Sequence, residues 1–188
     1  MEKKMLSNRK MNALGKFAAY ILRHGAHKEG VSVDSQGWLS INQLMEKASS
    51  QGQPCELKDI QDMVRLDNKG RYQISPDGLF IRALQGHSSE VVNIDFKAIE
   101  PPRYLFHGTA TRFLESIKEN GINKAQRQYV HLSDNLETAA AVGKRHGNLV
   151  ILRVDSQKMH QNGCVFYLSE NNVWLTDFVD PDYIVVIG

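Results

Sequence analysis

Arginine and histidine bind phosphate and transfer protons, and in this sequence they recur beside glycines and predicted turns. Arg23 and His24 precede a glycine at the end of a run with helical spacing. Arg71 follows a glycine ahead of a hairpin pattern, and Arg127 begins a short segment that ends in a serine. Few paired carboxylates accompany these groups. Because arginine binds phosphate oxygens through two parallel hydrogen bonds, the set indicates a site for a phosphorylated substrate.

Each of these clusters, taken alone, also has a purely structural interpretation. Cations at a helix C-terminus offset the helix dipole, which is sufficient to explain Arg23 and His24. A cation at the end of a strand, such as Arg71, is often only a solvated edge. Residue type and spacing therefore leave both interpretations open for these three residues.

Two further histidines lie on predicted strands, His107 in the segment FHGT and His131 in the segment RQYVHLS. One strand histidine is more often structural, but two beside small or hydroxyl residues favour a nucleotide pocket. The chain has no GxGxxG, no GxxxxGK[ST] and no HExxH, which excludes the Rossmann, P-loop and zinc-protease patterns. Cys55 and Cys164 are far apart and make no metal-ligand spacing, so we expect no metal site.

Helical periodicity predicts three helices in the first half, around 11–22, 41–48 and 57–64, with Gly25 ending the first and Ser40 capping the second. The turn sequence Ser75-Pro76-Asp77-Gly78 then predicts a hairpin between strands at 71–75 and 79–83. Three helices followed by a hairpin suggest a winged helix, a fold often used on nucleic acids. This suggestion is an analogy of fold and says little about function.

Pro101-Pro102 marks a predicted boundary, after a linker or edge segment at 95–100. Beyond it, the pattern predicts strands over 104–107, 129–132, 149–154, 165–168, 173–176 and 183–187, with helices over 109–120 and 136–146. We therefore predict an α+β chain with two domains, 1–95 and 101–188.

Composition is that of a folded protein: 188 residues, 41% apolar and a net charge of +2. The first 28 residues are basic, which suits a polyanionic partner or a solvated helix face. The seven cations are Lys3, Lys4, Arg9, Lys10, Lys16, Arg23 and Lys28. No leader and no apolar run of about 18 residues is visible, so we expect no membrane partner. The two separated cysteines favour a reduced, cytoplasmic protein, and we expect a monomer.

The combined motifs resemble the tRNA 2'-phosphotransferase family from about Leu14 to about Ile187. The matching segments are LRHGA, the Gly37-Trp38 step, KGRYQIS, IRALQGHS, YLFHGT, RQYVHLS and ENNVWLTD. Any one motif is weak, but their order and spacing together are specific. One departure is Asn172, where the family often has glycine. Asparagine tolerates the left-handed backbone, so we expect that turn to be kept.

The resemblance implies an N-terminal winged-helix lobe that holds RNA and a C-terminal lobe similar to ADP-ribosyltransferases that holds NAD. It implies a reaction in two steps. The RNA 2'-phosphate attacks C1'' of the nicotinamide ribose and expels nicotinamide, and O2'' of that ribose then attacks the phosphate. The products are RNA with a free 2'-OH and ADP-ribose 1'',2''-cyclic phosphate, so NAD is consumed as co-substrate.

Residue by residue, Arg23, Arg71 and Arg127 match the family's three phosphate-binding arginines. They would orient the phosphate and stabilise the charge that develops in the transition state. His24 matches the catalytic histidine, either as proton donor to the departing RNA O2' or as a further phosphate contact. Arg82 and the segment QGHS at 85–88 match a family motif near the cleft.

The NAD-binding residues implied by the resemblance lie in the second half. His107, with Gly108 and Thr109 beside it, resembles the histidine that contacts the NAD ribose. His131 and Ser133 resemble residues at the nicotinamide end of the pocket.

Two other functions remain open. The first is an ADP-ribosyltransferase that acts on protein or on phosphorylated nucleic-acid ends. Many such enzymes use a catalytic glutamate on a late strand, and Glu170 is the nearest candidate here. A non-catalytic nucleic-acid-binding module would be expected to lack some of Arg23, His24, Arg71 and Arg127. All four are present in this sequence.

Overall fold

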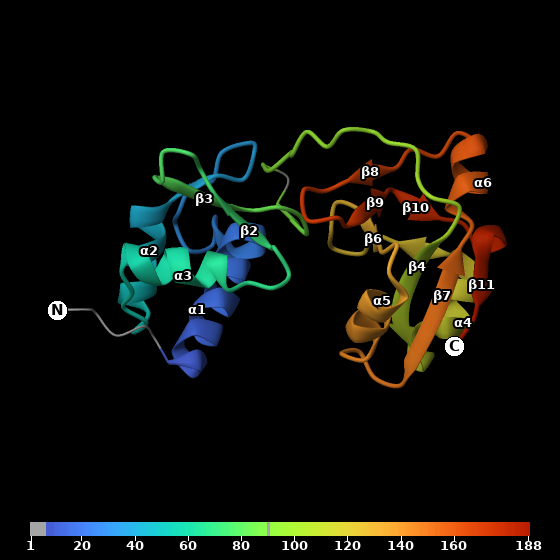
Figure 1. The fold of residues 1–188 in the computed structure, drawn as a ribbon, viewed down its shortest axis with the longest axis horizontal. Coiled ribbons are helices and arrows are strands. Elements are labelled where there is room, and N and C mark those ends of the chain that lie inside the picture. Colours follow the sequence, from blue (N-terminus) through green and yellow to red (C-terminus); the bar gives the residue numbers. More distant parts are fainter. Residues whose placement is uncertain (1–6, 90) are drawn as a thin grey trace. The chain divides into compact units, whose positions relative to one another are not determined.

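The computed structural model describes residues 7–89 and 91–188. The chain divides into two compact units, Met1–Asp95 and Phe96–Gly188, coloured blue to green and green to red in Figure 1. Within the described residues, no helix combines the length and the apolar character needed to cross a bilayer. Each unit has its own hydrophobic core.

Unit 1 begins with α1 (Asn8–Tyr20), whose N-cap is Ser7. The apolar side chains of α1 recur at helical spacing and turn Leu14, Phe17 and Ala18 into the core. The helix continues directly into a π-helical turn, η1 (Ile21–Gly25). The predicted helix and its end at Gly25 are confirmed, but periodicity alone gave no indication of the wider final turn.

The next two predicted helices are confirmed as α2 (Ile41–Ser50) and α3 (Leu57–Arg65). Glu56 and Asp59 form a capping box at the start of α3, which satisfies two backbone N–H groups. Ser40 is the N-cap of α2, as expected, but its side chain makes no capping hydrogen bond. Ser40 belongs instead to the short strand β1 (Leu39–Ser40), which pairs with β3.

The predicted hairpin is confirmed as β2 (Tyr72–Ile74) and β3 (Phe80–Ala83), which are antiparallel. With β1 they make a three-stranded sheet in the order β1-β3-β2. Gly78 has φ of +74°, a conformation that side chains rarely adopt, so glycine suits the turn. Helices α1, α2 and α3 pack on one another and on this sheet through one continuous core (Figure 1).

Unit 2 contains two three-stranded antiparallel sheets and one strand pair. In the first sheet, β7 (Leu149–Val154) lies between β4 (Leu105–Ala110) and β11 (Ile184–Val186). In the second, β9 (Trp174–Thr176) lies between β6 (Val130–Leu132) and β8 (Tyr167–Leu168). The pair is β5 (Ile122–Asn123) with β10 (Phe178–Val179). A bridge between Phe106 and Ser133 joins the two larger sheets at β4 and β6.

The helices of unit 2 are α4 (Thr111–Asn120), α5 (Leu136–Gly143), α6 (Ser156–Gln161) and the 3-10 turn η2 (Pro181–Tyr183). Helices α4 and α5 pack against β4 and β7 (Figure 1). At Gly108 the α5 backbone comes so close that an added Cβ would overlap the carbonyl oxygen of Ala139. Asn172 has φ of +59°, which confirms the left-handed turn expected there.

The fold class α+β is confirmed, with several differences in detail. The predicted strand at 183–187 is η2 followed by β11, and the predicted helix at 136–146 ends at Gly143. Strands β1, β5 and β10 and helix α6 were not predicted. Each is only two to six residues long, too short for hydrophobic periodicity to distinguish it.

Candidate functional site

The π-turn η1 carries Arg23 and His24 side by side. A π-turn holds one more residue than an α-helical turn, and such turns occur often at functional sites. Arg23 is half-buried, and its Nε and Nη2 atoms lie below the surface. His24 is exposed. The sequence-predicted pair therefore stands at the surface end of the first helix, with one member partly embedded in the unit.

The segment after β3 returns to this turn and holds it. The backbone N–H of Ser88 donates to the carbonyl of Arg23 over 3.0 Å, and the Ser88 hydroxyl lies 2.9 Å from Nδ1 of His24. Four residues earlier, the N–H of Leu84 donates to the carbonyl of Arg71 over 3.0 Å. One short stretch of backbone therefore fixes the main chain at both sequence-predicted arginines of unit 1.

Arg71 is held by Asp67. Its Nη2 and Nε atoms donate to the carboxylate over 2.7 Å and 3.0 Å, and its backbone N–H donates over 2.6 Å. The Asp67 side chain is 3% exposed and that of Arg71 34%. Burial favours the neutral carboxylic acid, but the hydrogen bonds from Arg71 outweigh it and lower the pKa of Asp67. The same hydrogen bonds raise the pKa of Arg71, so its cation is fixed in charge and in place.

Tyr72 connects the two arginines electrostatically. Its hydroxyl donates to the carbonyl of Gly15 over 2.6 Å, and its ring lies 5.3 Å from the Arg71 guanidinium carbon. Burial raises the pKa of the Tyr72 hydroxyl, while the positive charges of Arg71 and Arg23 oppose that rise. Both arginines therefore act on one buried ring. The structure brings Arg23, His24 and Arg71 into one neighbourhood of unit 1.

His87 lies beneath this neighbourhood and is 2% exposed. Burial, followed by the charges of Arg23, His24 and Arg82, lowers its pKa from 6.5 to about 4, so its ring is neutral at neutral pH. A side chain at Gly37 would approach Nε2 of His87 to 3.3 Å. Sequence reasoning placed the histidine in a motif but gave no sign of its burial.

Arg82 contacts Gln73 and Trp38. Its Nε donates to Oε1 of Gln73 over 2.7 Å, and its guanidinium lies 4.5 Å from the centre of the Trp38 ring. Stacking on an aromatic face restrains the orientation of an arginine side chain. Trp38 and Gln73 were not predicted as site residues, since only spatial proximity identifies them.

In unit 2, His107 on β4 lies beside His131 on β6. Nδ1 of His107 is 3.1 Å from the backbone oxygen of His131, so this nitrogen carries a proton and donates. Burial lowers the pKa of His107, the hydrogen bond to the His131 carbonyl opposes this change, and the charges of Arg127 and His146 lower the pKa further. The ring is thus a neutral group with a defined tautomer, whose Nε2 is an acceptor.

Arg127 donates from Nη1 to Nδ1 of His131 over 2.8 Å. Because arginine is always a donor, Nδ1 of His131 is unprotonated and the proton of the neutral ring lies on Nε2. Burial lowers the pKa of Arg127 from its usual value. The three sequence-predicted residues His107, His131 and Arg127 therefore form a chain of contacts in unit 2.

The other predicted cofactor residues support this chain through the backbone. Ser133 exchanges two hydrogen bonds with Phe106, of 2.7 Å and 2.9 Å, and its hydroxyl accepts from the N–H of Asn135. Gly108 faces the α5 backbone, and Thr109 is 5% exposed. Glycine at 108 is therefore needed for packing, and Thr109 belongs to the interior of the unit.

Aromatic rings that sequence reasoning missed surround the same strand. Tyr129 is two residues before His131, and its ring makes edge contacts with Phe96 and Tyr167 at 5.9 Å and 5.5 Å. On β9, the indole Nε1 of Trp174 is buried with no hydrogen-bond partner among the described residues. The alternation of Tyr129 and His131 along one strand was the available signal for the rings.

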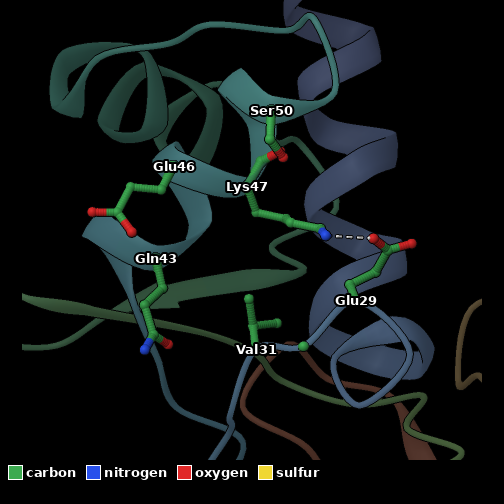
Figure 2. Close-up of a pocket in the computed structure, with 7 residues that line it drawn as sticks. Glu29, Val31, Gln43, Glu46, Lys47 and Ser50 are labelled. Carbon is green, nitrogen blue, oxygen red and sulfur yellow. Dashed lines mark hydrogen bonds and ion pairs between the residues drawn. The ribbon is translucent and has the colours of Figure 1, made fainter.

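Two further places lie apart from these clusters. Glu170, the carboxylate that an ADP-ribosyltransferase would need on a late strand, is exposed in the turn between β8 and β9. Figure 2 shows a depression in unit 1 that no sequence-predicted site residue lines. There Lys47 of α2 reaches across to Glu29 and forms an ion pair of 2.9 Å.

Comparison with known proteins gives a consistent result. The model of a family described as RNA 2'-phosphotransferase, Tpt1 / KptA family, matches residues 8–178. A protein of Agrobacterium fabrum named probable RNA 2'-phosphotransferase is 47% identical over 174 residues, 93% of each chain. Proteins of the same name from Pseudomonas fluorescens and Fusobacterium nucleatum are 42% and 45% identical. These matches cover 95% and 91% of this chain, and 98% and 96% of the relatives.

Proposed function

Because this chain belongs to the RNA 2'-phosphotransferase family, we propose that it removes the 2'-phosphate of RNA, such as spliced tRNA, with NAD consumed as co-substrate. The observation that carries the proposal is the cluster of Arg23, His24 and Arg71 in unit 1. Ser88 binds the Arg23 backbone and the His24 ring, and Asp67 binds the Arg71 guanidinium. Such a cluster is suited to a phosphate monoester.

We assign RNA to unit 1, as a winged-helix lobe, and NAD to unit 2, as an ADP-ribosyltransferase-like lobe. Three helices followed by a β-hairpin support the first assignment. For the second, the donors of unit 2 fit a dinucleotide. The Arg127 guanidinium, Nε2–H of His131 and the buried indole N–H of Trp174 match the acceptors of phosphate, ribose and carboxamide groups.

The first step needs orientation more than a base. A phosphate monoester is largely ionised at neutral pH, since its second pKa is about 6. NAD supplies the ribose carbon that the phosphate oxygen attacks and, later, the hydroxyl that removes the phosphate. Arg71, fixed by Asp67, holds the nucleophile in one orientation. The RNA 2'-phosphate becomes ADP-ribosylated in this step.

The second step transfers the phosphate away from RNA and places charge on its equatorial oxygens. Arg23, Arg71 and Arg127 stabilise that charge as fixed cations. The proton that O2'' of the ribose loses on attack is taken up by the departing O2' of RNA, which leaves as a hydroxyl, and His24 donates a hydrogen bond to the phosphate. The products are RNA with a 2'-OH, ADP-ribose 1'',2''-cyclic phosphate and the nicotinamide released earlier. We place this activity in the cytoplasm, since Cys55 and Cys164 are both free thiols.

The test is conversion of a short RNA bearing one internal 2'-phosphate, with and without NAD. We expect 2'-OH RNA, nicotinamide and the cyclic phosphate in equal amounts, and none of the three without NAD. As a matched control, Arg112→Ala removes an arginine of α4 that stacks on Phe113, outside both clusters, and we expect it to retain activity. Equal conversion without NAD, or none with it, would contradict the proposal.

A further inference from the structure

We propose that Ser88 is a positioning residue that holds the His24 imidazole by Nδ1, so that Nε2–H is the group presented to the RNA phosphate. The phosphate part of this statement rests on the proposed function. The part that concerns the imidazole rests on unit 1 alone.

Ser88 is bound to the π-turn twice. Its backbone N–H donates to the carbonyl of Arg23 over 3.0 Å, and its hydroxyl is 2.9 Å from Nδ1 of the next residue, His24. The bond between Ser88 and His24 joins residues 64 positions apart in the chain. A solvent-exposed loop serine usually hydrogen-bonds water, whereas Ser88 contacts two successive residues of one turn.

The segment that carries Ser88 is anchored on both sides. Before it, His87 is buried with its Nε2 toward Gly37, and Leu84 donates to the carbonyl of Arg71. After it, Val92 is fully buried. The Ser88 hydroxyl is therefore held on a fixed backbone at the surface, and it can restrain a neighbouring side chain with little further loss of entropy.

The chemistry decides which ring nitrogen must carry the proton. A phosphate offers only acceptors, so the nitrogen that faces it must be an N–H. A neutral imidazole has one such group, and a serine hydroxyl is able to donate as well as accept. When the Ser88 hydroxyl donates to Nδ1, the proton of the ring lies on Nε2. A donor aimed at phosphate then exists without charging the ring.

The two histidines of the candidate site in unit 2 likewise have tautomers that are set by a bond at Nδ1. In unit 2, His107 donates through Nδ1 to a carbonyl and His131 accepts at Nδ1 from Arg127. A Ser88 hydroxyl that donates to Nδ1 of His24 gives the same tautomer as in His131. In many histidines with a chemical role, a hydrogen bond at one ring nitrogen fixes the orientation of the ring and the protonation of the other nitrogen.

The test uses nitrogen NMR of the whole chain labelled with ¹⁵N, at about pH 8, where an ordinary histidine is neutral. Long-range proton–nitrogen spectra distinguish a protonated ring nitrogen from an unprotonated one, and His24→Gln assigns the His24 signals by their loss. We expect His24 to be the Nε2–H tautomer in the unmodified chain. Ser88→Ala should convert it into a mixture of both tautomers.

Ser89→Ala is the matched control, since Ser89 is the next hydroxyl along the chain and accepts from the N–H of Val91 at 3.3 Å. We expect its His24 spectrum to match that of the unmodified chain. Ser88→Thr keeps the hydroxyl and should restore the Nε2–H tautomer, which separates loss of the bond from disturbance of the loop.

In the phosphotransfer assay, Ser88→Ala should lower kcat by about 10-fold, the effect of losing one side-chain hydrogen bond at a working group. The KM for NAD should stay within about 2-fold, and Ser88→Thr should recover most of kcat. An unchanged His24 tautomer in Ser88→Ala, or equal kcat in Ser88→Ala and Ser89→Ala, would overturn the proposal. If the chain instead lacks phosphotransfer activity, the proposed function fails, while the spectra still decide whether Ser88 sets the tautomer.

Discussion

Arg71 in unit 1 and Arg127 in unit 2 are both candidate phosphate ligands, yet the protein holds them in opposite ways. The Asp67 carboxylate accepts hydrogen bonds from Arg71, raises the pKa of Arg71 and offsets the charge of its guanidinium. Arg127 donates to the neutral ring of His131, and burial lowers its pKa. One cation is locked in place by an anion, and the other is oriented by a neutral acceptor.

The difference indicates different tasks. A cation paired with a carboxylate gains little by binding a second anion, but its geometry is rigid, so Arg71 is suited to orienting a phosphate. A cation whose partner is a neutral ring has more to gain from an anion, because that partner does not offset its charge. Arg127 should therefore contribute more to charge stabilisation than Arg71.

The largest expected effect comes from removing the less compensated cation. Arg127→Ala should lower kcat by about 10²–10³-fold, the usual effect of deleting one group that stabilises developing charge. Arg127→Lys should recover only part of this loss, since lysine lacks the planar fork. The measurement is single-turnover conversion of 2'-phosphorylated RNA. A loss in Arg127→Ala no greater than that in Arg112→Ala would remove Arg127 from the site.

The second prediction concerns acid stability, because each unit holds a histidine whose pKa is lowered, the buried His87 and the half-buried His107. For His87 the unfolded chain binds a proton below about pH 6.5, while the folded chain does so only below about 4. Unit 1 should therefore be fully stable above pH 6.5 and lose on the order of 3 kcal/mol between pH 6.5 and 4.

The two tryptophans make this measurable, since Trp38 lies in unit 1 and Trp174 in unit 2. Urea unfolding of Trp174→Phe, followed by Trp38 fluorescence, reports unit 1 alone. His87→Gln cannot titrate and should flatten the pH dependence in this background. A dependence that is the same with and without His87 would show that another group is responsible.

The third prediction tests the assignment of ligands to the two units. His107→Ala should raise the KM for NAD by about 10-fold, as expected for a lost contact of about 1.4 kcal/mol, and leave the KM for RNA nearly unchanged. Steady-state kinetics with each substrate varied in turn makes the comparison. The reverse pattern would move His107 out of the NAD-binding unit.

The smallest effect is expected for the acid that holds Arg71. Asp67→Asn keeps the shape and one acceptor but removes the charge, so it should cost about 1 kcal/mol of stability. It should also lower kcat only about 3-fold, because Arg71 remains present. Chemical denaturation and the phosphotransfer assay measure the two effects. A loss as large as that of Arg127→Ala would contradict the division of tasks between the arginines.

The sequence was sufficient for most long elements, because their apolar residues recur with a clear period. It predicted α1, α2, α3 and the hairpin of unit 1, and most strands of unit 2. It did not predict β1, β5 or β10, since two-residue strands arise from pairing between distant segments rather than from local pattern. The π-turn was also missed, because its five residues are too few to show a helical period different from that of an α-helix.

The candidate site was predicted by residue type and by resemblance, but its support was not. Nothing in the order of residues pairs Arg71 with Asp67 rather than leaving it solvated, and nothing links Ser88 with His24 across 64 positions. Likewise, the requirement for glycine at 108 depends on the approach of the α5 backbone. Contacts made by tertiary packing are the part that local sequence does not encode.

The π-turn at Ile21–Gly25 has a consequence for how this chain tolerates insertions and deletions. Because a π-turn holds one residue more than an α-helical turn, it accommodates a one-residue insertion within the helix. Deleting one residue between Tyr20 and Ala26 would let the turn relax into a regular α-helix and would leave the residues beyond it on the same side of the helix axis. At Gly30 and Gly52 an added Cβ would meet no atom within 4 Å, so we expect the loops there to accept changes in length more readily.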